Sequence, residues 1–173
     1  MVYYVIQVVT NREKSFCEKV KKLSSFLSEN YKFIFLTREL QIRKQGVIST
    51  EEKPVFSSYV FLESEGELLD GTLAELKKIP GFCKFLNSNR DISPLVDKDL
   101  EVIKHFMKIG EKLGSSLVRF DENDRIVVLE GPLKGLEGNI VKVDRRKKRA
   151  KVQMDIKGYL HAFDLGFEDI GER

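Results

Sequence analysis

The stretch Gly131-Pro132-Leu133-Lys134-Gly135-Leu136-Glu137-Gly138 decides how the C-terminal part of the chain is expected to fold. Its glycines permit positive φ angles and a close backbone approach at the corner of a small barrel. A short apolar segment follows, and then a dense basic run from Arg145 to Lys151. A glycine-containing barrel turn next to such a run indicates contact with nucleic acid.

Short strand patterns flank this stretch. They cover residues 125–129, 139–143, 150–154 and 161–165. Strands this short and closely spaced must curl into a small barrel to bury their faces and edges. We therefore expect an all-β, SH3-like barrel domain over residues 119–173, joined to the rest of the chain by a linker at residues 108–118, where periodicity is lost and Gly and Ser appear.

The first 107 residues carry both helical and strand patterns. Strands are expected at 3–9, 33–42, 55–62 and 82–86, and helices after an N-cap at Asn11, over 68–78 and over 97–107. The turn at 43–47 needs its glycine. The pattern predicts an α+β domain over residues 1–107, in which an antiparallel sheet is flanked by helices.

Charge is concentrated in one region. The formal net charge is only +3, from 30 basic and 27 acidic residues. From Lys142 to Lys157, however, eight basic residues stand against two acidic ones. Such a run provides what phosphate attraction needs. The candidate RNA contacts are Lys134, Arg145, Arg146, Lys147, Lys148, Arg149, Lys151 and Lys157. A solvated, highly charged turn is the alternative.

Two aromatic residues of the barrel could stack on RNA bases. An RNA hairpin is a better target than a plain duplex, because the splayed bases of a loop allow sequence readout that a deep A-form groove denies. Tyr159 and Phe163 are the candidate stacking partners, although aromatic residues in a small barrel more often belong to the core.

Catalytic and metal-binding functions find little support. Cys17 and Cys83 are the only cysteines and form no CxxC motif, so neither a disulfide framework nor a zinc site is expected. A thiol hydrolase would need Cys17 beside His105 or His161. The sequence around the cysteines shows no nucleophile signature. We expect a non-enzymatic protein without cofactor or metal, acting in the cytoplasm as a monomer. No segment approaches the roughly 18 apolar residues of a membrane span.

Motifs along the chain resemble the NusG family in the right order. Tyr3 to Gln7 is similar to the opening of its N-terminal (NGN) domain, and Phe56-Ser57-Ser58-Tyr59-Val60-Phe61 to its Phe-Pro-Gly-Tyr-Val motif. Further similarities are Ile79-Pro80-Gly81-Phe82, Ser93-Pro94-Leu95 and, for the KOW motif, Asp124 to Pro132 with Gly135 and Gly138.

The resemblance implies a transcription elongation factor whose NGN domain docks aromatic side chains on the clamp helices of the largest RNA polymerase subunit. Carried over by position, the docking candidates are Tyr3, Phe56 and Tyr59. Phe56 and Tyr59 lie three apart in an expected strand, so alternation predicts that one ring is at least partly exposed, unless helices cover both faces.

Two departures from the family pattern point to a specialised paralogue. Ser57-Ser58 replaces Pro-Gly, and we expect that turn to be less rigidly set. Lys157 stands where the family has an aromatic residue that contacts the termination factor Rho or a ribosomal protein. With the basic run, this resembles the LoaP-like antiterminators, whose KOW domain binds an RNA hairpin.

The expected function is therefore suppression of pausing and termination by a polymerase-bound factor that contacts a structured leader RNA. Three alternatives stay open. One is a general NusG-type elongation and termination factor whose barrel binds Rho or a ribosomal protein. Another is a ribosome-associated RNA-binding protein, and the third is a thiol enzyme. Contact of the N-terminal domain with non-template DNA also stays open.

Overall fold

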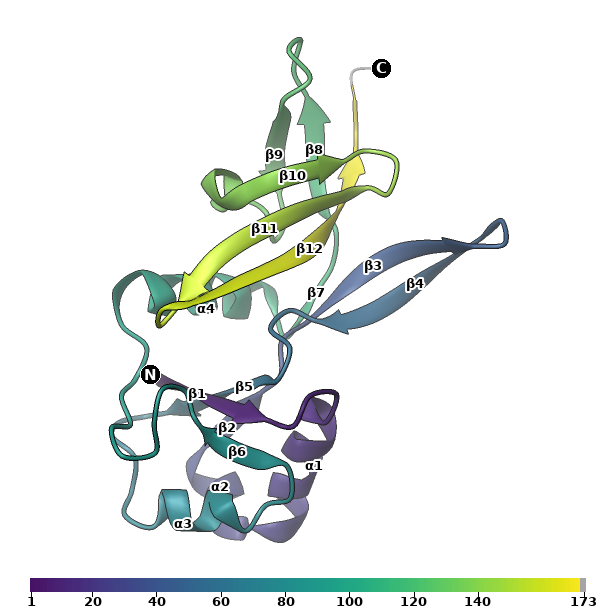
Figure 1. The fold of residues 1–173 in the computed structure, drawn as a ribbon. Helices are drawn as coiled ribbons and strands as arrows, with labels where there is room; N and C mark the ends of the chain where they lie inside the picture. Colours follow the sequence, from purple (N-terminus) through teal and green to yellow (C-terminus); the bar gives the residue numbers. More distant parts are fainter. Residues whose placement is uncertain (172–173) are drawn as a thin grey trace. The chain divides into compact units, whose positions relative to one another are not determined.

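The computed structural model describes residues 1–171 (Figure 1). Contacts divide the chain into two units, each formed by two segments. The first unit holds Met1–Leu36 and Phe56–Glu101, and the second holds Thr37–Val55 and the chain from Val102 onward. The observed α+β fold, with a β half-barrel at the C-terminal end, confirms the expected class. Domain borders at residues 107 and 119 stay a prediction.

The first unit is built on a four-stranded antiparallel sheet in the order β2-β5-β1-β6. Its strands are β1 (Val2–Val8), β2 (Lys32–Ile34), β5 (Tyr59–Ser64) and β6 (Phe82–Phe85). The helices α1 (Glu13–Leu23), α2 (Ser25–Asn30) and α3 (Thr72–Lys77) lie on one side of this sheet (Figure 1). Alternate residues of β1 pack there with α1, and the core includes Tyr4, Ile6, Val8, Phe16 and Val20.

One expected helix is in fact two. Asn11 has a φ of 63°, and the N-cap of α1 is Arg12 instead. Ser24 is extended, with φ −141° and ψ 104°, so α1 ends before it. The Ser24 hydroxyl then accepts a hydrogen bond of 3.2 Å from the Leu27 N–H and caps α2. A serine that competes locally for backbone donors thus breaks the helix in spite of continuous apolar spacing.

The barrel of the second unit is a five-stranded sheet in the order β10-β11-β12-β8-β9. Its strands are β8 (Ser116–Phe120), β9 (Ile126–Glu130), β10 (Ile140–Asp144), β11 (Arg149–Ile156) and β12 (Tyr159–Asp169), with a short 3-10 helix at Glu137–Asn139. The end of β12 pairs in parallel with β8 and so joins β10, β11 and β12 to β8 and β9 in one sheet. Inward side chains of β11 and β12 alternate in sequence and form the core with Val118 and Val128.

The glycine turn has one position that only glycine fits. Gly131 has a φ of +97°, and an added Cβ would lie 2.7 Å from the Ser116 Cα. Ser116 also accepts a hydrogen bond of 2.9 Å from the Leu133 N–H. Gly135 has a φ of +83° in open space. The expectation was wrong for Gly138, whose φ is not positive and whose surroundings are open.

A long hairpin and part of a helix also belong to the second unit. Strands β3 (Thr37–Lys44) and β4 (Val47–Pro54) form the hairpin, and β7 (Lys112–Leu113), in the expected linker, pairs in parallel with β3. Helix α4 spans Asp97–Ile109. Its Phe106 ring lies edge-on to Phe163, 6.3 Å between centroids. Its His105 imidazole hydrogen-bonds the Pro132 carbonyl at 3.0 Å.

Candidate nucleic-acid interface

The basic turn, residues 145–148 between β10 and β11, has a defined backbone. The Asp144 carboxylate accepts a hydrogen bond of 2.9 Å from the Lys147 N–H. Lys148 adopts a positive φ of 52°, and its N–H donates to the Arg145 carbonyl at 3.2 Å. The Lys148 carbonyl in turn accepts from the Phe167 N–H at 3.0 Å. These bonds fix the backbone from which the basic side chains of the turn extend.

Two arginines of the basic run are already engaged within the chain. Arg145 lies over the Phe120 ring and forms ion pairs with Asp124 at 2.6 Å and Asp169 at 3.2 Å. Arg149 donates to the Gln41 carbonyl at 2.8 Å, and its side chain is only 20% exposed. Both arginines therefore have a structural role in the second unit.

Four other basic residues are exposed side by side. They are Arg146, Lys147, Lys148 and Lys151. Among residues 1–171, none of these side chains forms an ion pair. Packing like charges so closely is unfavourable unless a partner neutralises them. This group is the strongest candidate for contact with phosphate.

The structure does not bring the remaining predicted contacts to the same place. Lys134 lies in the glycine turn, and its ammonium donates to the Val128 carbonyl at 3.0 Å. Lys157 lies in the turn after β11, with a φ of 51°. The length of β11 separates it from the basic turn, a distance of about 23 Å at roughly 3.3 Å per residue. Lys157 and the basic turn therefore cannot contact the same phosphate.

The stacking hypothesis is wrong for one of its two rings. Phe163 is 4% exposed, because it points into the barrel core and packs against Phe106. The Arg38 guanidinium lies 5.8 Å from the Phe163 ring centre. Tyr159 is 43% exposed but pairs with Ile156, at the end of β11 opposite the basic turn.

Sequence reasoning counted Lys142 in the basic run but did not name it as a candidate RNA contact. It faces Lys151 directly across the β10–β11 ladder. A small cleft of about 130 Å³ opens beside this pair. Its lining residues are Lys142, Asp144, Lys147, Arg149, Lys151 and Asp164. The pairing of Lys142 with Lys151 is the signal that would have identified Lys142. This pairing depends on a bulge between Ile140 and Lys142.

The three residues predicted to dock on RNA polymerase are all buried. Tyr3 is 6% exposed, and its hydroxyl donates to the Glu63 carboxylate. Burial, and next this hydrogen bond, raise the pKa of Tyr3 to about 12. The expectation that Phe56 or Tyr59 is exposed was wrong, since they are 1% and 8% exposed. The two side chains do not point to opposite faces of one strand, because β5 begins at Tyr59 and Phe56 precedes it in a turn.

The turn at Ser57-Ser58 is firmly held, contrary to expectation. Ser58 has a φ of 69°, and its N–H donates to the Glu13 carboxylate at 2.6 Å. Its hydroxyl hydrogen-bonds the Thr10 hydroxyl at 2.6 Å, and its carbonyl accepts from the Val8 N–H at 2.8 Å. Long-range hydrogen bonds thus replace the rigidity that Pro-Gly would give.

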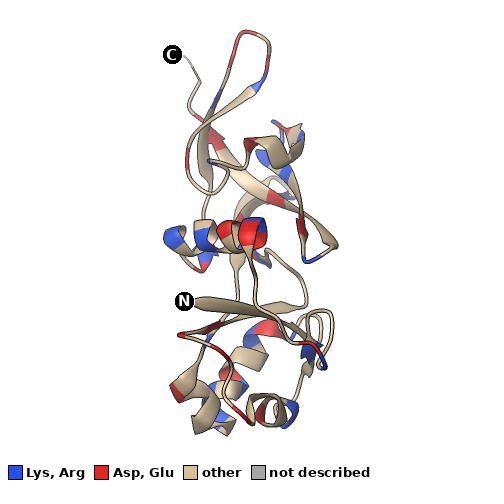
Figure 2. Ribbon diagram, turned by 90° about the vertical axis from the view of Figure 1, so that its left-hand side faces the viewer, with Lys and Arg blue, Asp and Glu red and all other residues tan. Residues whose placement is uncertain are grey.

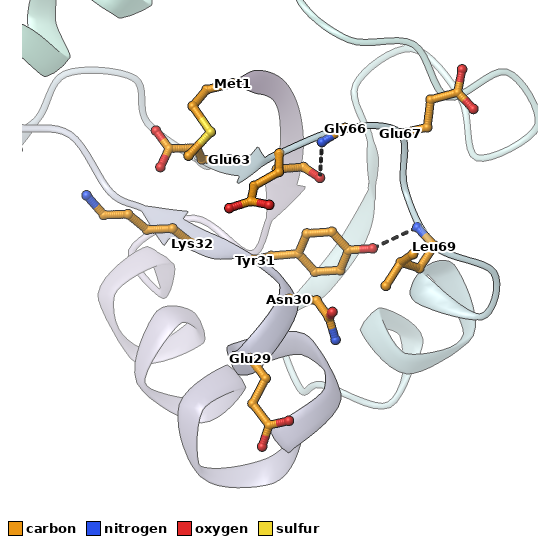
Figure 3. A pocket seen from close by; sticks show the side chains of 11 residues that line it. Met1, Glu29, Asn30, Tyr31, Lys32, Glu63, Gly66, Glu67 and Leu69 are labelled. Carbon is orange, nitrogen blue, oxygen red and sulfur yellow. Dashed lines mark hydrogen bonds between the residues drawn. The ribbon is translucent and has the colours of Figure 1, made fainter.

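A larger pocket in the first unit has the wrong charge for RNA. It has a volume of about 610 Å³, and Figure 3 shows carboxylates around it with the Tyr31 ring at its floor. The acidic lining residues are Glu29, Glu63, Glu65 and Glu67. The Tyr31 hydroxyl accepts a hydrogen bond of 2.8 Å from the Leu69 N–H. Phosphate would be repelled here.

Acidic and basic residues are interspersed along most of the ribbon (Figure 2). Within residues 1–171, no cluster of His, Cys, Asp or Glu is arranged to hold a metal ion. In the same range, no helix is long and apolar enough to cross a membrane.

Comparison with known proteins decides the family. A family model described as "Transcription termination factor nusG" matches residues 1–104, and a KOW motif model matches residues 122–155. The chain belongs to the NusG family. It is accordingly a NusG-type transcription termination/antitermination factor and not an enzyme.

Individual NusG proteins are similar along nearly the whole chain. The Rickettsia felis transcription termination/antitermination protein NusG is 22% identical over 97% of this chain and 88% of its own length. The Borreliella burgdorferi protein of the same name is 25% identical over 97% and 96%. A solved structure, "Domain interaction in Thermotoga maritima NusG", covers 95% of this chain and 93% of its own with a TM-score of 0.59. At 18% identity it shows the fold alone.

Proposed function

We propose that this NusG-family chain is a specialised antitermination factor. It docks on RNA polymerase through its NGN region and contacts a structured leader RNA through the basic turn of its KOW barrel. The observation that carries the proposal is the group of four exposed basic side chains without ion pairs among residues 1–171, Arg146, Lys147, Lys148 and Lys151. Lys157, at the position of a family aromatic residue, supports an RNA partner over Rho or a ribosomal protein.

The proposed mechanism is thermodynamic. Docking on the clamp helices biases the polymerase toward its elongating state. A tethered RNA contact raises the effective concentration of the factor at selected transcripts. Pausing and termination would then be suppressed at those transcripts, as in the LoaP-like antiterminators. Tyr3, Phe56 and Tyr59 are the proposed docking residues, and their use requires them to become more exposed than they are in this structure.

RNA binding by the full chain tests the proposal. The probe is a fluorescent leader RNA that folds into a hairpin, and the variant is R146A/K147A/K148A. A matched control, K14A/K21A/K22A, removes the same charge from the exposed face of α1. The proposal expects the first variant alone to lose affinity.

Retention on immobilised RNA polymerase separates the two halves of the proposal. The basic-turn variant should be retained like the wild type, because its NGN region is unchanged. If the wild type binds polymerase but no RNA, the specialised role is wrong and a general NusG-type factor with a protein-binding barrel is favoured. Co-purification with ribosomal subunits instead of polymerase would favour the ribosome-associated alternative.

A further inference from the structure

The cleft beside the basic turn combines side chains from three strands. On the outward face of the barrel, Lys142 of β10 pairs with Lys151 of β11, which pairs in turn with Asp164 of β12. Asp144 and Arg149 form the next pair toward the basic turn. A row of residues across three hydrogen-bonded strands is a rigid arrangement, because each side chain starts from a fixed backbone position.

The charges in this cleft do not balance within the chain. Four cationic and two anionic side chains line it. Like charges directly opposite each other destabilise a sheet, and Lys142 and Lys151 are such a pair. Neither forms an ion pair among residues 1–171. The Asp164 carboxylate is 3.9 Å from Arg149, and the Asp144 carboxylate accepts from the turn backbone. An anion between the two lysines would relieve their repulsion.

One guanidinium that lines the cleft has a nitrogen without a partner. The Arg149 Nε is buried and makes no hydrogen bond to any of residues 1–171. The terminal Nη2 of the same guanidinium is fixed by the Gln41 carbonyl at 2.8 Å. A buried donor without an acceptor is unfavourable. The cleft therefore combines excess positive charge with a guanidinium that the chain holds in place but does not fully satisfy.

The absence of aromatic rings from this face decides what kind of ligand fits. Within the described part of the chain, no aromatic residue lines the cleft. The inward positions of β11 and β12, including Phe163, face the barrel core, and Tyr159 pairs with Ile156, about 17 Å along β11 from Lys151 at roughly 3.3 Å per residue. Single-stranded nucleic acid is normally held by bases stacked on aromatic rings. A base-paired RNA stem is instead bound through its phosphates and shape.

We infer that the cleft between Lys142 and Lys151 is a phosphate subsite that takes the sugar-phosphate backbone of a base-paired RNA stem. This rests on the proposed function and narrows it, because it moves the contact from the loop bases to the stem. The exposed basic turn lies at the end of the same ladder, so one strand of the stem contacts both.

The test uses the full chain and two labelled RNA probes. One is a hairpin with a stem of about 16 base pairs. The other is an RNA of the same length and composition that cannot pair. The variants are K142A/K151A, its charge-preserving counterpart K142R/K151R, and the control K21A/K22A. Circular dichroism checks that each variant is folded.

We expect the wild type to bind the stem more tightly than the unpaired RNA. K142A/K151A should bind the stem about tenfold more weakly at moderate salt, with a salt slope smaller by about 2. K142R/K151R and K21A/K22A should bind like the wild type. Unchanged stem binding by K142A/K151A, or tighter binding to the unpaired RNA, would overturn the inference. If R146A/K147A/K148A still lost binding in that case, the proposed function would stand. Failure of the wild type to bind either RNA would overturn both.

Discussion

The guanidinium of Arg145 lies 4.0 Å from the centre of the Phe120 ring, between the carboxylates of Asp124 and Asp169. This arginine connects the basic turn to β8, to the β8–β9 turn and to the end of β12. Arg145 differs in role from the three basic residues that follow it, although all four look alike in the sequence. Arg145 stabilises the barrel, whereas Arg146, Lys147 and Lys148 extend into solvent.

Replacing Arg145 by alanine should therefore lower stability more than RNA affinity. The loss of the ring contact and two exposed ion pairs predicts a decrease of about 1–2 kcal/mol in the free energy of unfolding. Lys148→Ala should change it by less than about 0.5 kcal/mol. Urea unfolding of the full chain measures both, and equal effects of the two substitutions would contradict this assignment.

Lys142→Glu should separate stability from function. It replaces a repulsive cross-strand pair by an attractive one with Lys151, so the free energy of unfolding should rise by about 0.2–1 kcal/mol at low salt. RNA affinity should fall at the same time, because the cleft loses its excess positive charge. Parallel unfolding and binding measurements test this, and a variant that is both less stable and fully able to bind would refute it.

Gly131→Ala should be far more disruptive than Gly135→Ala. Both positions have positive φ angles, but only the Cβ at position 131 would collide with Ser116, at 2.7 Å. We expect a loss of about 2–4 kcal/mol for Gly131→Ala and about 1–2 kcal/mol for Gly135→Ala. Thermal unfolding measures both losses. Because both positions share the cost of a positive φ angle, the difference between the two losses gives the cost of the collision with Ser116. Similar losses would show that the collision is relieved by movement of β8.

Tyr3 should make stability depend on pH at the alkaline end. Its folded pKa is raised from 10.0 to about 12, so the neutral hydroxyl is favoured in the folded chain. The resulting stabilisation is complete below pH 10 and is lost as the pH rises through about 12. Tyr3→Phe removes this ionisation, so its free energy of unfolding should fall less steeply over that range. If the free energy of unfolding falls equally steeply with pH in the wild type and in Tyr3→Phe, the assignment is contradicted.

Local sequence patterns predicted much of the fold and less of the site. Periodicity and the glycine turn indicated the α+β part and the barrel, since both signals are local. The break at Ser24 escaped because one local hydrogen bond, from the Leu27 N–H to the Ser24 hydroxyl, overrides continuous apolar spacing. The turn at Phe56 escaped because long-range bonds, such as that from the Ser58 N–H to the Glu13 carboxylate, set its backbone angles.

The site was harder to predict because charge in a sequence does not reveal its partners. Arg145 and Lys148 look equivalent until the β8–β9 turn and the end of β12 bring Asp124 and Asp169 beside Arg145. Lys142 gains its importance only through its register with Lys151, and Phe163 loses its stacking role because it faces the core. These relationships arise from strand pairing between distant segments.

The most direct test of the central claim is a salt titration of full-length chain binding to a structured leader RNA. If about four phosphates are neutralised, the slope of log affinity against log salt should be about −3 to −4 for the wild type. For R146A/K147A/K148A the slope should become shallower, at about −2, the share that Lys142 and Lys151 retain. A shallow slope for the wild type, unchanged in the variant, would contradict RNA binding by the basic turn.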